Sequence, residues 1–370
     1  MPSITAIVVN WNAPQLTSRA VHSLLASAGV ASFEVIIVDN GSSDGSAEAL
    51  EREFAGVAGV RILPLPTNRG FGGGVNAGMR ASQAERIALL NNDAVADAGW
   101  LAALSRELDS PGAERVGAVT STILLEGLWR ELPNGEEAQA GSRTLTSPDG
   151  MRFTQSDASD PRAVRLINST GNELDESGNG GDRDWLRPVS DQIEASPEVF
   201  GFCGGAAMLR RDAIRDVGGF DESLFMYYED TDLSWRMRQA GWEVRYCADA
   251  LVTHAHGASS DAASAARIRW NARNRVIVAM QNAPAAMAAR ALARTLARTA
   301  AVVLRRPTSR STRAEANGML LALGDIAVRT PNALGRRLHR LRRARYTHDT
   351  AMPEGGIGAP TGRNVNGSAH

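Results

Sequence analysis

Short apolar runs alternate with amphipathic segments along the first 120 residues. The apolar runs predict buried strands, and they cover residues 4–9, 33–38, 60–63, 87–90 and 116–120. The amphipathic segments predict helices, one starting near Pro14 and others covering residues 47–54, 75–81 and 100–108. Strands that alternate with helices in this way predict an α/β fold around a mainly parallel sheet.

Polar residues stand where several of these strands end. Asn10 follows the first strand, Asp39 the second, and Asn91–Asp93 the strand at 87–90. The carboxyl ends of parallel strands meet at one edge of a sheet and form its ligand crevice. We therefore expect these side chains to lie close together at a binding site.

The pattern changes after residue 120. Gly, Ser, Asn, Asp and Pro dominate residues 126–198, which predicts loops and hairpins over the active site. A helix is predicted over 233–240 and a strand over 243–247, and a long helical segment rich in Ala and Arg follows. One domain is predicted, with a first half over residues 1–120 and a second half over residues 121–265. A helical extension over residues 266–346 and a disordered tail over residues 347–370 are predicted to follow it.

Composition narrows the setting. Every basic side chain is Arg, so phosphate charge must be met by Arg, by a metal or by backbone N–H groups. The only two cysteines, Cys203 and Cys247, argue against a disulfide framework and suit a reducing cytoplasm. The N-terminus lacks a signal-peptide pattern, and no apolar run reaches membrane-spanning length. A cytoplasmic location is predicted.

Charge is concentrated near the C-terminus. Residues 286–345 carry fourteen Arg against Glu315 and Asp325, whereas the whole chain has a net charge of −1. Two segments are amphipathic, with arginines at 290, 294 and 298 opposite Leu292 and Leu296, and arginines at 336, 337, 340 and 343 opposite leucines at 334, 338 and 341. Such helices can lie on the anionic inner face of the cell membrane, or they can pack on the catalytic domain with solvated arginines. Nucleic acid is a poor fit because interleaved aromatic residues are missing.

Three carboxylates, Glu229, Asp230 and Asp232, follow the turn Gly218-Gly219-Phe220-Asp221-Glu222. They could simply be acids at a helix N-terminus, which the helix dipole favours. Three other segments precede them: Val-Asp-Asn-Gly-Ser-Ser-Asp at 38–44, Asn-Arg-Gly-Phe-Gly at 68–72 and Asn-Asn-Asp at 91–93. In this order the four motifs resemble the inverting family 2 glycosyltransferases with the GT-A fold, a Rossmann-like α/β fold, and among them most closely bacterial rhamnosyltransferases of cell-surface polysaccharide assembly.

The resemblance implies that the first half binds a nucleoside diphosphate sugar. Asp39 would contact the base or ribose, although it could equally cap the turn that follows it, and both can hold at once. Arg69 and Asn76 lie at a glycine loop that opens a helix, where diphosphate could bind; the alternative is a flexible surface loop. The full set of expected donor-binding residues is Asn10, Asp39, Asn40, Arg69, Gly70, Asn76, Asn91, Asn92, Gly204 and Gly205.

A divalent cation, Mn²⁺ or Mg²⁺, is expected because a diphosphate leaving group develops negative charge. In the family this position carries Asp-x-Asp; here Asn91 replaces the first acid, which leaves Asp93. His254, which closes an apolar strand and is followed by Gly-x-Ser, matches the family's metal-binding histidine and is preferred to His256.

By its match to the family's Glu-Asp-x-Asp motif, Asp230 is the expected catalytic base, with Glu229 orienting acceptor or neighbouring donors. Asp232 is expected to pair with Arg236 or to contact the acceptor, and Tyr228 and Trp235 either stack on sugars or pack internally.

The predicted activity is inverting, metal-dependent transfer of a sugar, rhamnose from dTDP-rhamnose as the first choice, to a hydroxyl of a glycan or lipid-linked glycan. One alternative is a nucleotidyltransferase, which requires a glycine-rich basic loop directly after the first strand. This chain has Asn10–Pro14 at that position, which does not match such a loop. A catalytically silent glycan-binding scaffold would not need Asp93, Asp230 and His254.

Overall fold

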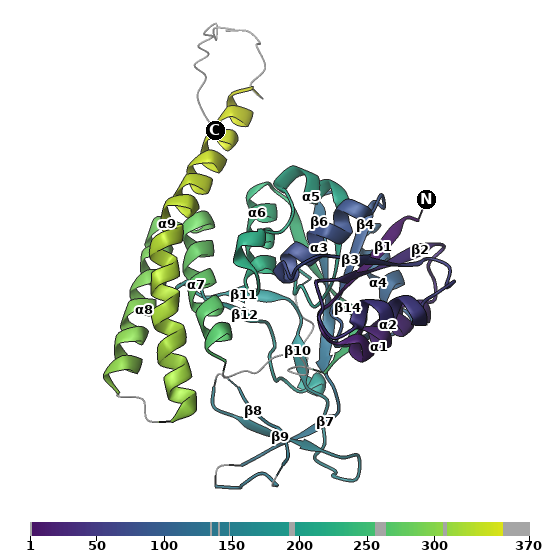
Figure 1. The fold of residues 1–370 in the computed structure, drawn as a ribbon, viewed down its shortest axis with the longest axis horizontal. Helices are drawn as coiled ribbons and strands as arrows, with labels where there is room; N and C mark the ends of the chain where they lie inside the picture. The colour runs from purple at the N-terminus through teal and green to yellow at the C-terminus, as the bar shows by residue number, and fades with distance from the viewer. Residues whose placement is uncertain are drawn as a thin grey trace, which may run out of the picture.

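A nine-stranded sheet with helices on both faces forms the body of the molecule, and three long helices stand beside it (Figure 1). The computed structural model describes residues 2–133, 135–139, 141–147, 149–191, 197–255, 264–305 and 309–350. The predicted α/β class with a C-terminal helical extension is confirmed.

The order of the strands places the predicted motifs at one edge. Along the sheet they run β3 (Val60–Pro64), β2 (Phe33–Asp39), β1 (Ile4–Asn10), β4 (Arg86–Leu90), β13 (Ala206–Arg210), β6 (Val116–Leu125), β14 (Glu243–His254) and β5 (Ala94–Ala96), with β10 (Ile167–Ser169) paired to β6. The strands β3, β2, β1 and β4 are mutually parallel, and β14 is parallel to β6. β13 is antiparallel to both its neighbours and joins the two parallel parts.

Each face of the sheet has its own core. Helices α1 (Pro14–Leu25), α2 (Ser46–Glu53) and α4 (Trp100–Leu108) cover one face, and α3 (Gly70–Ala81), α5 (Arg211–Val217) and α6 (Glu229–Gln239) cover the other. Side chains alternate along β1, so Val8 packs into the first core and Ile7 into the second. This accounts for the continuous apolar strands.

Helix α3 begins at Gly70, although the sequence predicted a loop there and a helix only from Val75. Glycine has low helix propensity, which hid the first turns. The glycines are needed because α3 approaches β1 closely: an added Cβ would lie 2.8 Å from Val9 Cγ1 at Gly74 and 2.9 Å from Ile7 Cγ2 at Gly78.

Other predicted bounds were too short. β6 runs to Leu125 and so crosses the predicted division at residue 120, α6 begins at Glu229, and β14 extends to His254. The extensions of α6 and β14 carry Glu229, Asp230 and His254, polar residues that a search for apolar periodicity does not assign to buried elements.

Hairpins fill the region that was expected to hold loops and hairpins. A three-stranded sheet consists of β7 (Leu128–Glu131), β8 (Thr144–Thr146) and β9 (Arg152–Ser156), and β11 (Asn172–Leu174) pairs with β12 (Gly180–Asp182). A short 3₁₀ turn, η1 (Val189–Asp191), follows them, and a second, η2 (Glu222–Leu224), precedes α6.

The C-terminal helices are α7 (Ala265–Asn282), α8 (Ala285–Leu304) and α9 (Arg310–Thr350), and α7 packs on both others (Figure 1). The helix α9 continues past residue 346, and residues 351–370 of the predicted tail lie outside the described part. No helix in the described part of the chain is long and apolar enough to cross a membrane.

The orientation of α9 reverses one expectation. Arg336 pairs with Asp221, Arg337 donates to main-chain carbonyls of α7 and its C-terminus, and Arg340 donates to Asn282, so these arginines face the protein. Leu334 and Leu338 on the same helix are 45% and 55% exposed. This part of α9 is therefore packed on the protein, as the second alternative stated, but these arginines bond to protein groups instead of being solvated, and Leu334 and Leu338 face outward.

Candidate active site

Two glycines connect the end of β4 to the acidic start of α6. The Asn91 N–H donates to Gly205 O at 2.8 Å, and the Gly204 N–H donates to Asp230 Oδ2 at 3.0 Å. An added Cβ on Gly204 would lie 3.2 Å from Phe71 Cε1, and one on Gly205 would lie 3.3 Å from Asn91 Nδ2. A side chain at either glycine would meet a tight contact, and the connection brings Asn91, Gly204, Gly205 and Asp230 together.

Asp230 lies half-buried in the first turn of α6. Its Oδ1 accepts from the Thr231 N–H at 2.7 Å, in addition to the bond from Gly204. The helix dipole favours negative charge at this end. The carboxylate is thereby fixed in place close to Gly204 and the end of β4.

Glu229 meets a different environment. It is 7% exposed, and burial, reinforced by the charge of Asp230, raises its pKa to about 8. Its Oε2 has no hydrogen-bond partner among the described residues. Glu229 is therefore a neutral acid at pH 7, suited to donating a hydrogen bond but not to accepting a proton.

Asp93 and His254 are brought together by the pairing of β14 with β5. His254 Nε2 lies 2.9 Å from Asp93 Oδ1, and His254 Nδ1 lies 2.7 Å from Asn168 Oδ1 on β10. Each ring nitrogen thus lies within hydrogen-bond distance of an oxygen, Nδ1 of the Asn168 amide and Nε2 of the Asp93 carboxylate, and these contacts fix the orientation of the ring. A carboxylate and an imidazole nitrogen aimed at one point form a donor set that fits Mn²⁺ or Mg²⁺.

This pair offers two ligands. Within the described ranges, no group of three or more His, Cys, Asp or Glu side chains could hold a metal ion. His256, the alternative ligand, lies outside those ranges.

Asp182 on β12 belongs to the same region and was missed by the sequence analysis. Desolvation raises its pKa to about 6, Ser169 opposes this shift, and the charge of Asp230 adds to it. Asp182 is exposed, and the charges of Asp230 and His254 both act on its pKa, so it lies near these two residues. Asp182 follows two glycines and lies in no apolar pattern, so nothing in the sequence indicated that it belongs to the site.

Several expected donor-binding residues instead hold neighbouring segments. Asn10 is fully buried and donates to Asp39 Oδ1 at 2.7 Å, and Asn40 accepts from the Arg69 N–H and donates to Gly70 O, each at 3.0 Å. The polar atoms of Asn10 and Asn40 bond to protein groups, and a contact of either side chain with the donor stays a prediction. Asp39 accepts from the Ser42 N–H and hydroxyl, so the turn cap exists; its contact with a nucleotide stays a prediction.

The start of α3 is fastened to the Gly-Gly-Phe-Asp-Glu segment. Asn76 exchanges two hydrogen bonds of 2.9 Å with the backbone of Phe220, and Arg69 Nη2 lies 2.6 Å from Glu222 Oε2. Gly70 has φ +73°, and an added Cβ would lie 2.0 Å from Phe225 O. These contacts give Asn76 and Gly70 a structural role, and their contact with the donor stays a prediction, as does that of Arg69, whose guanidinium pairs with Glu222.

The acceptor-side expectations divide. Asp232 is fully buried between Arg236 Nε and Asn282 Nδ2, each at 2.8 Å, so the predicted pairing with Arg236 is present, and its contact with the acceptor stays a prediction. Trp235 packs edge-on against Phe200 in an internal cluster, as the packing alternative stated. Acceptor contact by Tyr228 and donor contact by Asn91 and Asn92 stay predictions; all three are half-buried.

Sequence comparison supplies the family. Residues 5–218 match the model of glycosyl transferase family 2, and residues 183–313 match that of glycosyl transferase family group 2. The N-acetylglucosaminyl-diphospho-decaprenol L-rhamnosyltransferase of Mycobacterium tuberculosis is 31% identical over 251 residues, which are 62% of this chain and 69% of that protein. The pre-mycofactocin glycosyltransferase of the same organism is 30% identical over 226 residues, 60% of this chain and 38% of that protein.

Solved structures share the fold. GalNAc-T7, crystallised with UDP, GalNAc and Mn²⁺, superposes with a TM-score of 0.56 at 13% identity over 89% of this chain and 57% of its own. Residues 1–349 of S. aureus TarS superpose with a TM-score of 0.50 at 12% identity, and the match covers 95% of this chain and 93% of the TarS chain. The predicted GT-A fold is confirmed, and the nucleotidyltransferase alternative is excluded. The chain belongs to glycosyl transferase family 2 and is a glycosyltransferase of the rhamnosyltransferase-like type.

Proposed function

We propose that this glycosyltransferase moves rhamnose from dTDP-rhamnose to a hydroxyl of a lipid-linked glycan and inverts the anomeric centre. The donor sugar and the acceptor class are supported by the name of the mycobacterial relative. The placement of Asp230 near the end of β4, held by the Gly204 N–H at 3.0 Å, is the observation that carries the proposal.

In this mechanism Asp230 removes the acceptor hydroxyl's proton as that oxygen attacks the anomeric carbon and the bond to the diphosphate breaks on the opposite side. A single displacement of this kind inverts the configuration. Glu229, a neutral acid, donates a hydrogen bond in the site without competing for the proton.

Asp93 and His254 would hold a divalent cation, with Asn168 fixing the imidazole ring. When bound, the cation supplies positive charge that neutralises the leaving diphosphate.

The test is an assay with purified full chain, dTDP-rhamnose and a short-chain N-acetylglucosaminyl-diphospho-prenol, with UDP-N-acetylglucosamine and GDP-mannose as competing donors. We expect rhamnosyl transfer with Mn²⁺ or Mg²⁺, and a rise in melting temperature with dTDP-rhamnose alone among the donors. Transfer from another donor would refute the choice of rhamnose, and binding without any turnover would favour the silent scaffold.

A lipid-linked acceptor requires the enzyme to meet a bilayer, and the C-terminal helices offer a surface for it. Eight of the ten exposed large hydrophobic side chains in the described part of the chain lie on α8 and α9. We call them the outer face: Leu296, Val303, Leu304, Leu320, Leu321, Val328, Leu334 and Leu338.

The charge around the outer face favours anionic lipid over a second copy of the chain. Arginines at 290, 298, 305, 310 and 313 are exposed on these helices, whereas Glu315 and Asp325, the acids of the described residues 285–340, are half-buried and paired with Arg298 and Arg269. Two copies would oppose like charges, whereas phosphate headgroups complement them. The outer face is therefore proposed to rest on an anionic bilayer.

A further inference from the structure

We infer that Asn274 on α7 is a positioning residue for sugar transfer, because it holds the loop of residues 224–228 that leads directly into Glu229 and Asp230. This inference rests on the proposed role of Asp230 as the base. It makes the C-terminal helices part of the catalytic apparatus in addition to their proposed contact with lipid.

The loop adopts a backbone that its residues disfavour. Phe225, Tyr227 and Tyr228 have φ values of 67°, 70° and 69°, in the left-handed region where bulky side chains are rare. Such residues persist only where the surrounding structure holds them. The next residues along the chain are the acid pair, so the conformation of the loop sets where α6 begins.

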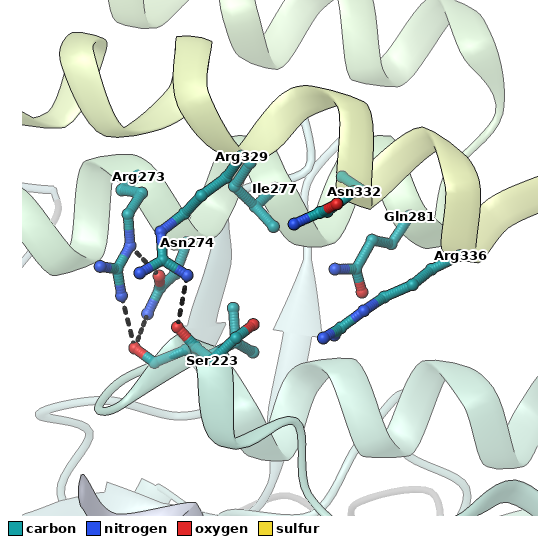
Figure 2. A pocket seen from close by; sticks show the side chains of 10 residues that line it. Ser223, Arg273, Asn274, Ile277, Gln281, Arg329, Asn332 and Arg336 are labelled. Atoms are coloured by element: carbon teal, nitrogen blue, oxygen red, sulfur yellow. Dashed lines mark hydrogen bonds between the residues drawn. The ribbon is translucent and has the colours of Figure 1, made fainter. Parts of the chain in front are cut away.

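Asn274 supplies much of that hold. Its Nδ2 lies 3.0 Å from Leu224 O, 2.8 Å from Met226 O and 2.7 Å from Tyr227 O, and the side chain is fully buried. Arg273 orients the amide by donating to Asn274 Oδ1 at 2.7 Å, and it also donates to Leu224 O at 2.6 Å. Figure 2 shows both side chains reaching down from α7 to the same carbonyl.

Other contacts close around the loop. Arg329 of α9 donates to Ser223 O at 3.1 Å just before it (Figure 2), and Trp270 of α7 packs on Phe225 with ring centroids 4.9 Å apart. On the opposite side the Phe71 N–H donates to Phe225 O at 2.9 Å. The Asp232 N–H then donates to Tyr228 O, which joins the loop to the first turn of α6. A shift of the loop therefore moves Asp230.

The same helix provides a matched control. Asn271 is half-buried, and its Nδ2 donates to Arg267 O of its own helix at 3.1 Å. Replacing it removes the same amide from α7 without touching the loop.

The experiment compares Asn274→Ala, Asn274→Asp and Asn271→Ala in the full chain. We expect Asn274→Ala to lower kcat at least tenfold while the Kd for dTDP-rhamnose, measured by calorimetry, changes less than twofold, because the proposed donor contacts lie on other elements. Asn274→Asp keeps the shape of the side chain but replaces the donating amide with a carboxylate, which cannot donate to the three carbonyl oxygens. The kcat of Asn274→Asp should therefore be no higher than that of Asn274→Ala. Asn271→Ala should match the wild type in both constants.

A near-normal kcat for Asn274→Ala, or a fall in kcat matched by an equal loss of donor affinity, would overturn the inference. If that variant does not fold, Arg329→Met decides: it removes one partly exposed contact and should lower kcat severalfold with unchanged donor Kd, and a normal kcat would refute the positioning role. Asp230→Asn, measured in parallel, separates the two proposals. If it is inactive while Asn274→Ala is active, only this inference fails; if it is active, the assignment of the base fails.

Discussion

Glu229 and Asp230 are neighbours in one helical turn, yet their surroundings give them different chemistry. Glu229 is buried and lacks a partner for Oε2 among the described residues, whereas Asp230 is half-buried and accepts two backbone hydrogen bonds. Burial favours the neutral form of a carboxyl group, which raises the pKa of Glu229. In the proposed mechanism Glu229 is therefore the hydrogen-bond donor of the pair and Asp230 the base.

The first prediction concerns Asp230. Asp230→Asn keeps the size of the side chain but removes the basic oxygen, so kcat should fall by about 10²–10⁴ with little change in donor affinity. The control is Glu229→Asn, which should be milder. Product NMR should show inverted anomeric configuration in the wild type; retained configuration, or a near-normal kcat for Asp230→Asn, would contradict the assignment.

The second prediction uses the raised pKa of Glu229. Unfolding lowers that pKa from about 8 to about 4.5, so between these values the native state holds a proton that the unfolded state releases. The free energy of unfolding therefore decreases as pH rises through this window. In Glu229→Gln this contribution is absent, so its melting temperature should fall less than the wild type's between pH 5 and pH 8. Parallel curves for the two proteins would show that Glu229 is not neutral in the native state.

The third prediction concerns the metal. Asp93→Ala removes the carboxylate of the proposed two-ligand pair and should abolish transfer while the fold is kept. Calorimetric titration with MnCl₂ alone should show weaker binding to this variant than to the wild type. Full turnover in excess EDTA would exclude the metal.

At the scale of elements, the ends of β1, β2 and β4 were predictable, and the starts of α3 and α6 were not. Apolar strands followed by polar residues predicted the crevice, because buried parallel strands are continuously apolar and their ends carry the ligands. The start of α3 was hidden because its glycines serve close packing on β1 rather than helix propensity. The polar contacts of Asn76 and Asn274 depend on segments far apart in the chain, which a single sequence does not pair.

The fourth prediction tests the role of the α3 glycines by comparing a glycine-to-alanine substitution in α3 with the same type of substitution in α9. Gly78→Ala places a Cβ 2.9 Å from Ile7 Cγ2 and should lower the free energy of unfolding by about 1–3 kcal/mol. Gly324→Ala in α9 has no atom within 4 Å and should raise it by about 0.5–1 kcal/mol, since alanine favours the helix. Chemical denaturation of both variants measures the two signs. Stabilisation by Gly78→Ala would show that α3 does not need close contact with β1.

At the scale of the whole molecule, apolar surface and charge are both concentrated on α8 and α9. The arginines that point inward fasten α9 to the protein, and the leucines beside them are left outside. A surface of this kind binds lipid through apolar contact as well as charge.

The fifth prediction is that the full chain floats with anionic liposomes in low salt, and that part of it stays bound in high salt because apolar contacts are not screened. Leu320→Ser combined with Val328→Ser should abolish the salt-resistant part. Met151→Ser, which removes an exposed apolar side chain from another region, is the control. A dimer in analytical ultracentrifugation that the double variant dissolves would identify a second copy as the partner instead.

The hold that α7 and α9 exert on residues 221–228 also has a consequence for synthesis of the chain. A ribosome makes the loop before it makes Asn274, Arg329 and Arg336, so the loop leaves the exit tunnel without the groups that later hold it. A nascent chain that has reached residue 264 contains Asp93, Asp230 and His254 and still lacks those groups. We therefore expect stalled ribosome–nascent chain complexes to bind donor earlier than they acquire transferase activity, with activity first seen once α9 has emerged.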